Sequence, residues 1–162
     1  MKYFNQVKNL EELKKEYRKL CFELHPDRNH GKDTTKEFQE MQNEYEKKFE
    51  EVKNIFVNSN GETYTKENTE TAKEFEEIIN KLVYMIDVDI DIIGNWIWVS
   101  GNTKTYKDEL KNLKFRWSAN KLAWYYHKGS FKKKSKANYN LDELKEMFEN
   151  TEVEKQLAKQ IA

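Results

Sequence analysis

The apolar residues of this chain change their period near residue 86, and this change limits the folds that the chain can adopt. Up to Val83, apolar side chains recur every three or four residues, which is typical of amphipathic helices. From Ile86 to Ile92, isoleucine and valine alternate with aspartate, which is typical of a half-buried β-strand. We therefore expect an α+β chain, with an all-helical N-terminal module followed by a small antiparallel-sheet module.

The sole proline, Pro26, separates the first two helical stretches. Asn9 is a typical N-cap residue for the first helix. A polar loop from Pro26 to Thr35 connects the first helix to the second. The apolar positions are Leu10, Leu13, Tyr17, Leu20, Cys21 and Leu24 before the proline, and Phe38, Met41, Tyr45, Phe49, Val52 and Phe56 after it. This pattern predicts an antiparallel helix pair.

The rest of the chain divides at turn-forming residues. Asn58-Ser59-Asn60-Gly61 is typical of a linker, and Gly94-Asn95 is typical of a two-residue hairpin turn. The elements expected after the linker are a helix up to about residue 84, strands at 86–92 and 96–99, a helix at 105–113, strands at 115–117 and 122–127, and a helix from about 140. We expect three segments: an N-terminal module at 1–57, a linker and bridging helix at 58–84, and an α+β module at 85–162.

Whole-chain charge and cysteine content exclude several classes of protein. Twenty-nine basic and 29 acidic residues give a net charge of +0, so the total charge indicates no partner. Cys21 is the only cysteine, which excludes an intrachain disulfide and a CxxC metal cluster. His30 and His127 lack companions at ligand spacing, so we expect neither a metal nor a cofactor. No apolar run is long enough to span a bilayer, and the N-terminus lacks the apolar core of a signal peptide; we expect a cytoplasmic protein.

The tripeptide His25-Pro26-Asp27 lies between the two helical stretches and behind a basic helix. Tyr3-Phe4, Glu16 to Leu20, His25 to Asn29, Phe38 and Tyr45 occur in the order and spacing of a J-domain. Residues 1–57 therefore resemble the J-domain (DnaJ-like) family. The resemblance implies a co-chaperone that binds a DnaK-type heat-shock chaperone and stimulates its ATP hydrolysis.

The resemblance also implies roles for individual residues. Asp27 would be the key contact with the chaperone's ATPase module, with His25 and Pro26 positioning it. Supporting contacts would come from Lys14, Arg18, Lys19, Asn29 and Phe38. Helical spacing supports these roles. Lys14 and Arg18 are four residues apart on one helical face, and a basic face suits an acidic patch on a partner.

Two departures from the family pattern affect this prediction. Glu23 stands at a usually basic position, and Leu24 stands where an aromatic residue usually precedes the histidine. Glu23 lowers the positive field near the loop, so we expect altered affinity or partner choice. A decoy that binds the chaperone without activating it is an alternative, which the presence of Asp27 disfavours.

The sequence gives no indication of an enzyme. His25 and Asp27 resemble an acid–base pair, but no nucleophile or set of metal ligands surrounds them. With five glycines and one cysteine, the chain lacks a Gly/Phe-rich segment and a zinc-binding client domain. It therefore resembles the minimal class of J-proteins, in which an unrelated module chooses where the chaperone acts.

All four tryptophans fall between residues 95 and 128, where lysines outnumber acidic residues. Candidate binding residues are Lys104, Lys107, Lys111, Arg116, Trp117, Lys121, Trp124 and Lys128. Basic side chains with exposed aromatics are typical of nucleic-acid binding. The segment is faintly similar to the HARP module of DNA-annealing helicases, and to the tail domain attached to J-domains in phage- and plasmid-type proteins.

Two other interpretations of this module stay open. A small domain needs bulky core residues, so the tryptophans can be structural; a second basic run, Lys132 to Lys136, is typical of a solvated loop. The module can also recognise a client protein or an assembly, and this is the function we expect. The alternative is a nucleic-acid-binding protein of a mobile element that recruits the chaperone to a replication or packaging complex.

Overall fold

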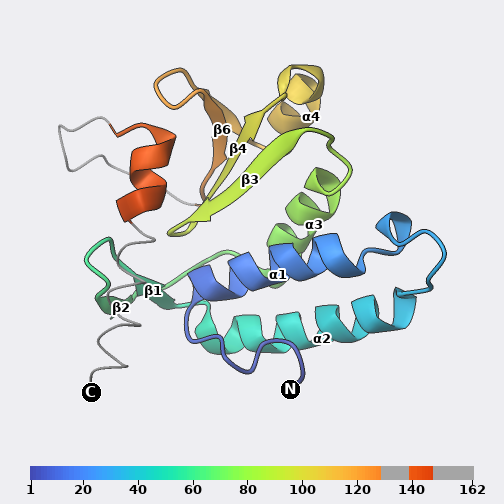
Figure 1. Cartoon of the computed structure of the whole chain (residues 1–162). Coiled ribbons are helices and arrows are strands. Elements are labelled where there is room, and N and C mark those ends of the chain that lie inside the picture. Colours follow the sequence, from blue (N-terminus) through green and yellow to red (C-terminus); the bar gives the residue numbers. More distant parts are fainter. Residues whose placement is uncertain (129–138, 148–162) are drawn as a thin grey trace. The chain divides into compact units, whose positions relative to one another are not determined.

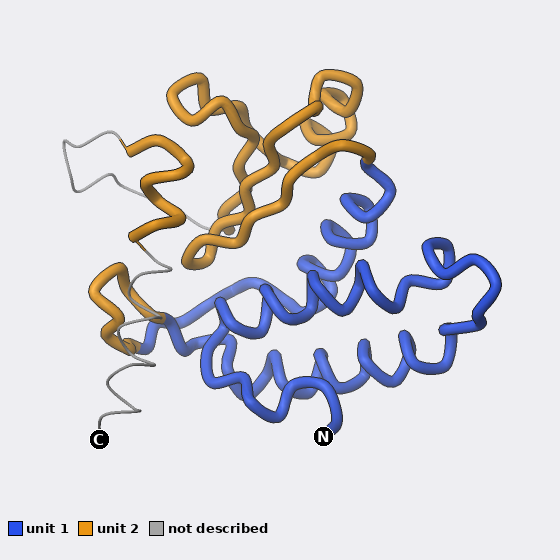
Figure 2. Tube along the Cα trace, viewed as in Figure 1, with its two compact units in different colours: residues 1–56, 65–85 blue, residues 57–64, 86–162 orange. Residues whose placement is uncertain are grey.

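The computed structural model describes residues 1–128 and 139–147. The chain divides into two compact units (Figure 2). Unit 1 comprises Met1–Phe56 and Thr65–Met85, and unit 2 comprises Val57–Tyr64 and Ile86–Ala162. The predicted α+β class is confirmed, since helices predominate in unit 1 and an antiparallel sheet forms unit 2.

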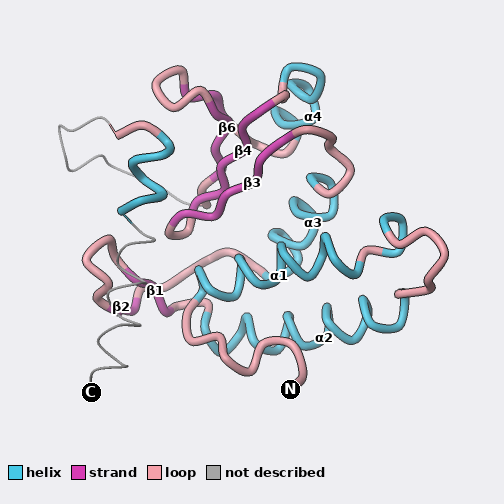
Figure 3. Tube along the Cα trace, viewed as in Figure 1, coloured by secondary structure: helices cyan, strands magenta, loops and turns pink. Residues whose placement is uncertain are grey.

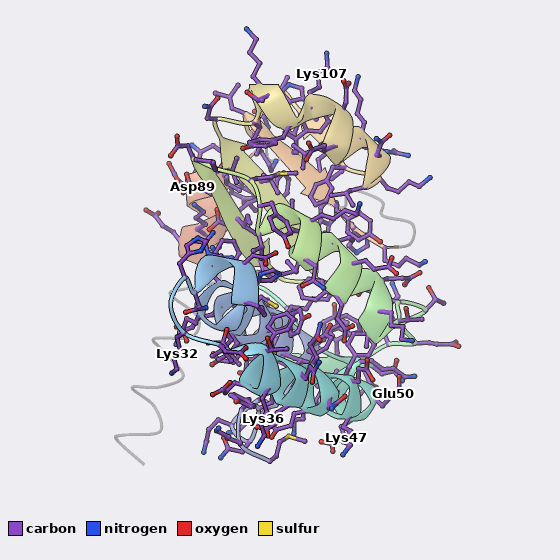
Figure 4. The ribbon with its side chains drawn as sticks, turned by 90° about the vertical axis from the view of Figure 1, so that its right-hand side faces the viewer. Lys32, Lys36, Lys47, Glu50, Asp89 and Lys107 are labelled. Carbon is purple, nitrogen blue, oxygen red and sulfur yellow. The ribbon has the colours of Figure 1, made fainter. Side chains whose placement is uncertain are left out.

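Unit 1 is built on two helices, α1 (Leu10–Leu24) and α2 (Thr35–Val52), which lie side by side (Figure 1). Asn9 caps α1 as predicted, because its side chain accepts a 2.9 Å hydrogen bond from the backbone N–H of Glu12. The apolar stripes face each other, and the rings of Tyr17 and Tyr45 lie 4.0 Å apart in the core. Lys36, Lys47 and Glu50 are exposed on α2 (Figure 4).

A third helix, α3 (Ala72–Leu82), completes unit 1. It begins with a capping box in which Thr71 and Glu74 bond each other's backbone N–H groups. Its fully buried Phe75 lies 5.9 Å from Tyr17 and 6.2 Å from Tyr45, ring to ring. α3 therefore shares one aromatic core with α1 and α2.

The segment expected to be a linker has its own structure. Strands β1 (Ile55–Val57) and β2 (Thr63–Thr65) pair, and Asn58–Gly61 lies in the turn between them. Asn58 stabilises this turn, because its side chain accepts hydrogen bonds from the N–H groups of Asn60 and Glu62 at 3.0 and 2.9 Å. Phe56 lies in β1 and not on the second helix as expected, since α2 ends at Val52.

Unit 2 contains a four-stranded antiparallel sheet of order β3-β4-β6-β5. Strands β3, β4 and β6 of this sheet are labelled in Figure 3. Its elements are β3 (Val88–Ile93), β4 (Trp96–Gly101), the 3-10 turn η2 (Lys104–Tyr106), α4 (Lys107–Asn112), β5 (Arg116–Ser118) and β6 (Ala123–Tyr126). The predicted hairpin turn joins β3 to β4, and Gly94 adopts the φ of 60° that such a turn requires.

Both faces of this sheet carry buried residues. Ile97 and Val99 of β4 are fully buried on one face. On the other, Ile93, Trp98 and Ala123 pack with Leu141 of the helix at 141–147. Within the described ranges, 1–128 and 139–147, every helix is too short or too polar to cross a membrane.

Candidate functional site

The turn that follows α1 is fixed by the backbone preferences of its residues. His25 has φ −59° and ψ 125°, the extended conformation favoured before a proline, so α1 ends at Leu24. Pro26 starts the 3-10 turn η1 (Pro26–Arg28), and the His25 Nδ1 atom accepts a 3.3 Å hydrogen bond from the backbone N–H of Asp27. The histidine therefore caps the turn that presents Asp27.

Two polar side chains bind this turn to the end of α1. The amide of Asn29 donates 2.9 Å hydrogen bonds to the carbonyl oxygens of Glu23 and His25. The hydroxyl of Thr34, which is buried, donates a 2.7 Å hydrogen bond to the carbonyl oxygen of Leu24. These bonds satisfy carbonyl groups at the helix end and connect the loop to α1.

The ring of His25 is buried between two other rings. Phe38 lies 5.3 Å away and Tyr84 lies 5.4 Å away, both in edge-to-face geometry. His25 is only 8% exposed, whereas Asp27 is exposed. The His25 ring is thus packed inside unit 1, and Asp27 lies at the surface.

Asp27 has a hydrogen-bond partner that the sequence analysis did not identify. The hydroxyl of Tyr84 donates a 2.5 Å hydrogen bond to Asp27 Oδ2, and this bond raises the pKa of Tyr84. Next to it, Arg28 donates a 3.2 Å hydrogen bond to the carbonyl oxygen of Val83. No sequence signal indicated this contact, because Tyr84 follows the apolar stripe of α3 and is 57 residues away from Asp27.

The basic residues of α1 have different environments. Lys14 is 1% exposed, lies 2.6 Å from Glu70, and has its ammonium 5.0 Å from the Phe75 ring centre. Burial lowers the pKa of Lys14, and the nearby Glu70 carboxylate opposes this effect. Lys14 is therefore part of the interior of unit 1. Lys19 is exposed.

Two guanidinium groups meet at a ring that the sequence analysis did not single out. Arg18 of α1 lies 5.3 Å from the ring centre of Phe22, and Arg28 of η1 lies 4.9 Å from the same ring. Phe22 is half-buried and Arg28 is exposed. Two positive charges, one from α1 and one from the turn that contains Asp27, therefore lie at this ring.

The candidate residues of unit 2 also separate by exposure. Lys104, Lys107, Lys111 and Arg116 are exposed, and Trp117 is 48% exposed. Trp124 is buried and meets Trp117 edge-on at 5.6 Å. Lys121 has its ammonium 5.6 Å from the Trp98 ring, and Lys128 is half-buried. The second basic run at 132–136 lies outside the described residues.

A row of aromatic rings lies on the sheet face that carries Trp98. Trp96 stacks on Trp98 at 5.8 Å and on His127 at 4.6 Å, and Tyr125 lies 5.5 Å from each tryptophan. Leu141 and Leu144 pack against this row. Among residues 1–128 and 139–147, no group of three or more His, Cys, Asp or Glu side chains can hold a metal ion.

The N-terminal part of the chain matches a known protein family. The family model described as the DnaJ domain matches residues 4–56, the segment that contains α1, η1 and α2. Searches of curated proteins and of solved structures gave no match.

Proposed function

The chain is a J-domain protein, and we propose that it binds a DnaK-type chaperone through Asp27 and stimulates that partner's ATP hydrolysis. J-domain proteins act in general as co-chaperones of Hsp70/DnaK ATPases and are generally not enzymes. The specific contacts proposed for this chain are Asp27, Arg18, Lys19 and the additional residues Phe22 and Arg28.

The presentation of Asp27 carries this proposal. The carboxylate is exposed on a short turn whose backbone is held by His25, Asn29 and Thr34. A rigid turn of this kind loses little conformational entropy on binding. Arg18 and Arg28 flank Phe22 beside the turn, which provides a basic surface for an acidic patch on the chaperone.

The proposed stimulation is allosteric. The J-domain supplies no reacting group; it accelerates hydrolysis only if it binds the hydrolysis-competent conformation of the ATPase more tightly than the other. Asp27 accepts hydrogen bonds from a cationic group that the competent conformation presents. Lys14 takes no direct part in this proposal, because it is buried against Glu70.

Titration of a DnaK-type ATPase module with the full chain tests this interface. We expect Asp27→Asn to abolish detectable binding and Asp89→Asn to leave it unchanged, because Asp89 is exposed in unit 2 (Figure 4). Equal binding by wild type and Asp27→Asn would contradict the proposed contact.

For unit 2 we propose recognition of a client protein or assembly through the β5–β6 hairpin. Leu122 is 71% exposed and has φ 50°, a left-handed conformation that is strained for leucine. Trp117 in the same hairpin is 48% exposed. Two large apolar side chains are thus exposed in one hairpin, one of them at a strained turn position, and their exposed surface contributes little to the stability of the fold, which supports a binding role.

A nucleic-acid ligand for unit 2 is the second candidate. Its support is the position of Trp117 next to the exposed Arg116, with exposed lysines on η2 and α4. Single-stranded DNA binding distinguishes the two proposals. Binding that weakens steeply as salt is added and is lost in Trp117→Ala supports a nucleic-acid ligand. Release of counterions from the phosphates causes the salt dependence, and loss of base stacking on Trp117 causes the effect of the substitution. No binding at low salt removes this candidate.

A further inference from the structure

Tyr84 lies outside the matched J-domain segment but contacts two residues of its central tripeptide. Its hydroxyl lies 2.5 Å from Asp27 Oδ2, and its ring lies 5.4 Å from that of His25. These contacts form within unit 1. The site around Asp27 is therefore built partly by the segment after α3.

The residues on either side of Tyr84 are buried, whereas the Tyr84 side chain is exposed to solvent. Val83 and Met85 are 2% and 5% exposed, and the Val83 carbonyl oxygen accepts the hydrogen bond of Arg28. Tyr84 itself is 58% exposed. Buried neighbours thus place the ring beside Asp27, while burial does not prevent the side chain from rotating away.

We infer that Tyr84 occupies the carboxylate of Asp27 in the free protein and must release it when a cationic group of the chaperone binds there. Tyr84 thereby sets the affinity of the docking site. A guanidinium that binds a carboxylate in bidentate geometry bonds to both oxygens, so it competes at Oδ2 with the Tyr84 hydroxyl that is bonded there. This inference rests on the proposed function, since it concerns the same carboxylate.

The hydrogen bond between Tyr84 and Asp27 is weak enough to lower the affinity for the chaperone without preventing binding. A hydrogen bond between exposed groups contributes modestly, so the released state is populated at about one part in two to one part in ten. The apparent Kd of the docking site rises by the same factor, because only the released population can bind.

Tyr84→Phe tests the inference, because it keeps the ring and removes only the donor. We expect the concentration of full-length protein that half-saturates a DnaK-type chaperone to fall roughly two- to tenfold, with the maximal rate of ATP hydrolysis unchanged. Tyr139→Phe serves as the control, since Tyr139 is also exposed. An unchanged or higher half-saturating concentration for Tyr84→Phe overturns the inference.

A second measurement tests the contact without the chaperone. Tyrosine ionisation is followed by ultraviolet absorbance, and the Tyr84 contribution is the difference between wild type and Tyr84→Phe. We expect Asp27→Asn to lower the pKa of Tyr84, since the hydrogen bond to Asp27 raises it. An unchanged pKa overturns the inference alone. If the contact is present but neither wild type nor Tyr84→Phe binds any DnaK-type chaperone, the proposed function fails and the inference with it.

Discussion

The Lys14 ammonium and the Glu70 carboxylate form a 2.6 Å ion pair between side chains that are 1% and 0% exposed. The two residues are 56 positions apart, so the pair connects α1 to the segment that precedes α3. Phe75 covers the ammonium at 5.0 Å. Helical spacing alone places Lys14 on a docking face. In the structure it lies in the interior of unit 1, where it contacts Glu70 before α3 and Phe75 in α3.

Removal of one partner of this pair is expected to destabilise unit 1. Lys14→Ala leaves the Glu70 carboxylate buried without its counter-ion, which costs about 3–5 kcal/mol of unfolding free energy. Urea unfolding followed by circular dichroism measures the loss. Lys53→Ala is the control, with an expected loss within about 1 kcal/mol, because Lys53 pairs with Glu50, whose side chain is 65% exposed. Equal losses for the two variants would contradict the assigned role of Lys14.

The basic surface beside the turn is expected to control the rate of docking. Arg18→Ala removes one of the two guanidinium groups at Phe22 and should weaken chaperone binding about two- to fivefold, chiefly through the association rate. The salt dependence of that rate should also decrease. Stopped-flow association measures both quantities, with Lys47→Ala on the exposed side of α2 as control. The prediction fails if the two variants associate at the same rate.

Glu76 is expected to make unit 1 less stable as the pH rises. Burial, with a contribution from Glu46, raises the pKa of Glu76 from 4.5 to about 7. Between pH 4.5 and about 7, folding therefore takes up a proton at Glu76. The contribution of the protonated carboxyl to stability is fully present below pH 4.5 and is lost as the pH rises through about 7. The expected loss is on the order of 2 kcal/mol.

Glu76→Gln removes the titrating group and is expected to flatten this dependence. Urea unfolding at pH 5 and pH 8 compares the two proteins. At pH 8 the variant should be the more stable by about 1–3 kcal/mol, because it buries no charge. A variant whose stability falls with pH as steeply as that of wild type would show that another group is responsible.

The tryptophans of unit 2 are expected to differ in their effects on folding. Trp98 is 5% exposed within the aromatic row, so Trp98→Ala should cost about 3–5 kcal/mol. Trp117 is 48% exposed, and Trp117→Ala should cost about 0.5–1.5 kcal/mol from its contact with Trp124. Circular dichroism during thermal unfolding provides the comparison. A larger loss for Trp117 would assign it to the core and remove it from the binding surface.

Local sequence signals predicted the elements that local interactions determine. Asn9 and Pro26 define the two ends of α1, and Gly94-Asn95 defines the turn between β3 and β4. The β1–β2 pair was missed because three-residue strands are too short to show a period, and the turn residues at 58–61 are equally typical of a linker. The alternation from Ile86 to Ile92 predicted a half-buried strand but did not reveal that both faces of the sheet carry buried residues.

The candidate site was only partly predictable for the same reason. The turn that presents Asp27 follows from residues adjacent in sequence, and the sequence identified it. Helical spacing defines a face but not what covers it, so neither the burial of Lys14 by Glu70 nor the contact of Tyr84 with Asp27 could be inferred. Both depend on packing of α3, which lies outside the matched segment.

Single-turnover ATP hydrolysis by a DnaK-type chaperone tests most directly whether this chain is an activating co-chaperone. The rate is measured with the wild-type chain, with Asp27→Asn and without either protein. We predict acceleration by the wild type and none by Asp27→Asn, because the proposed contact with the competent ATPase conformation requires the carboxylate. Equal acceleration by both proteins, or none by the wild type, would contradict the role assigned to Asp27.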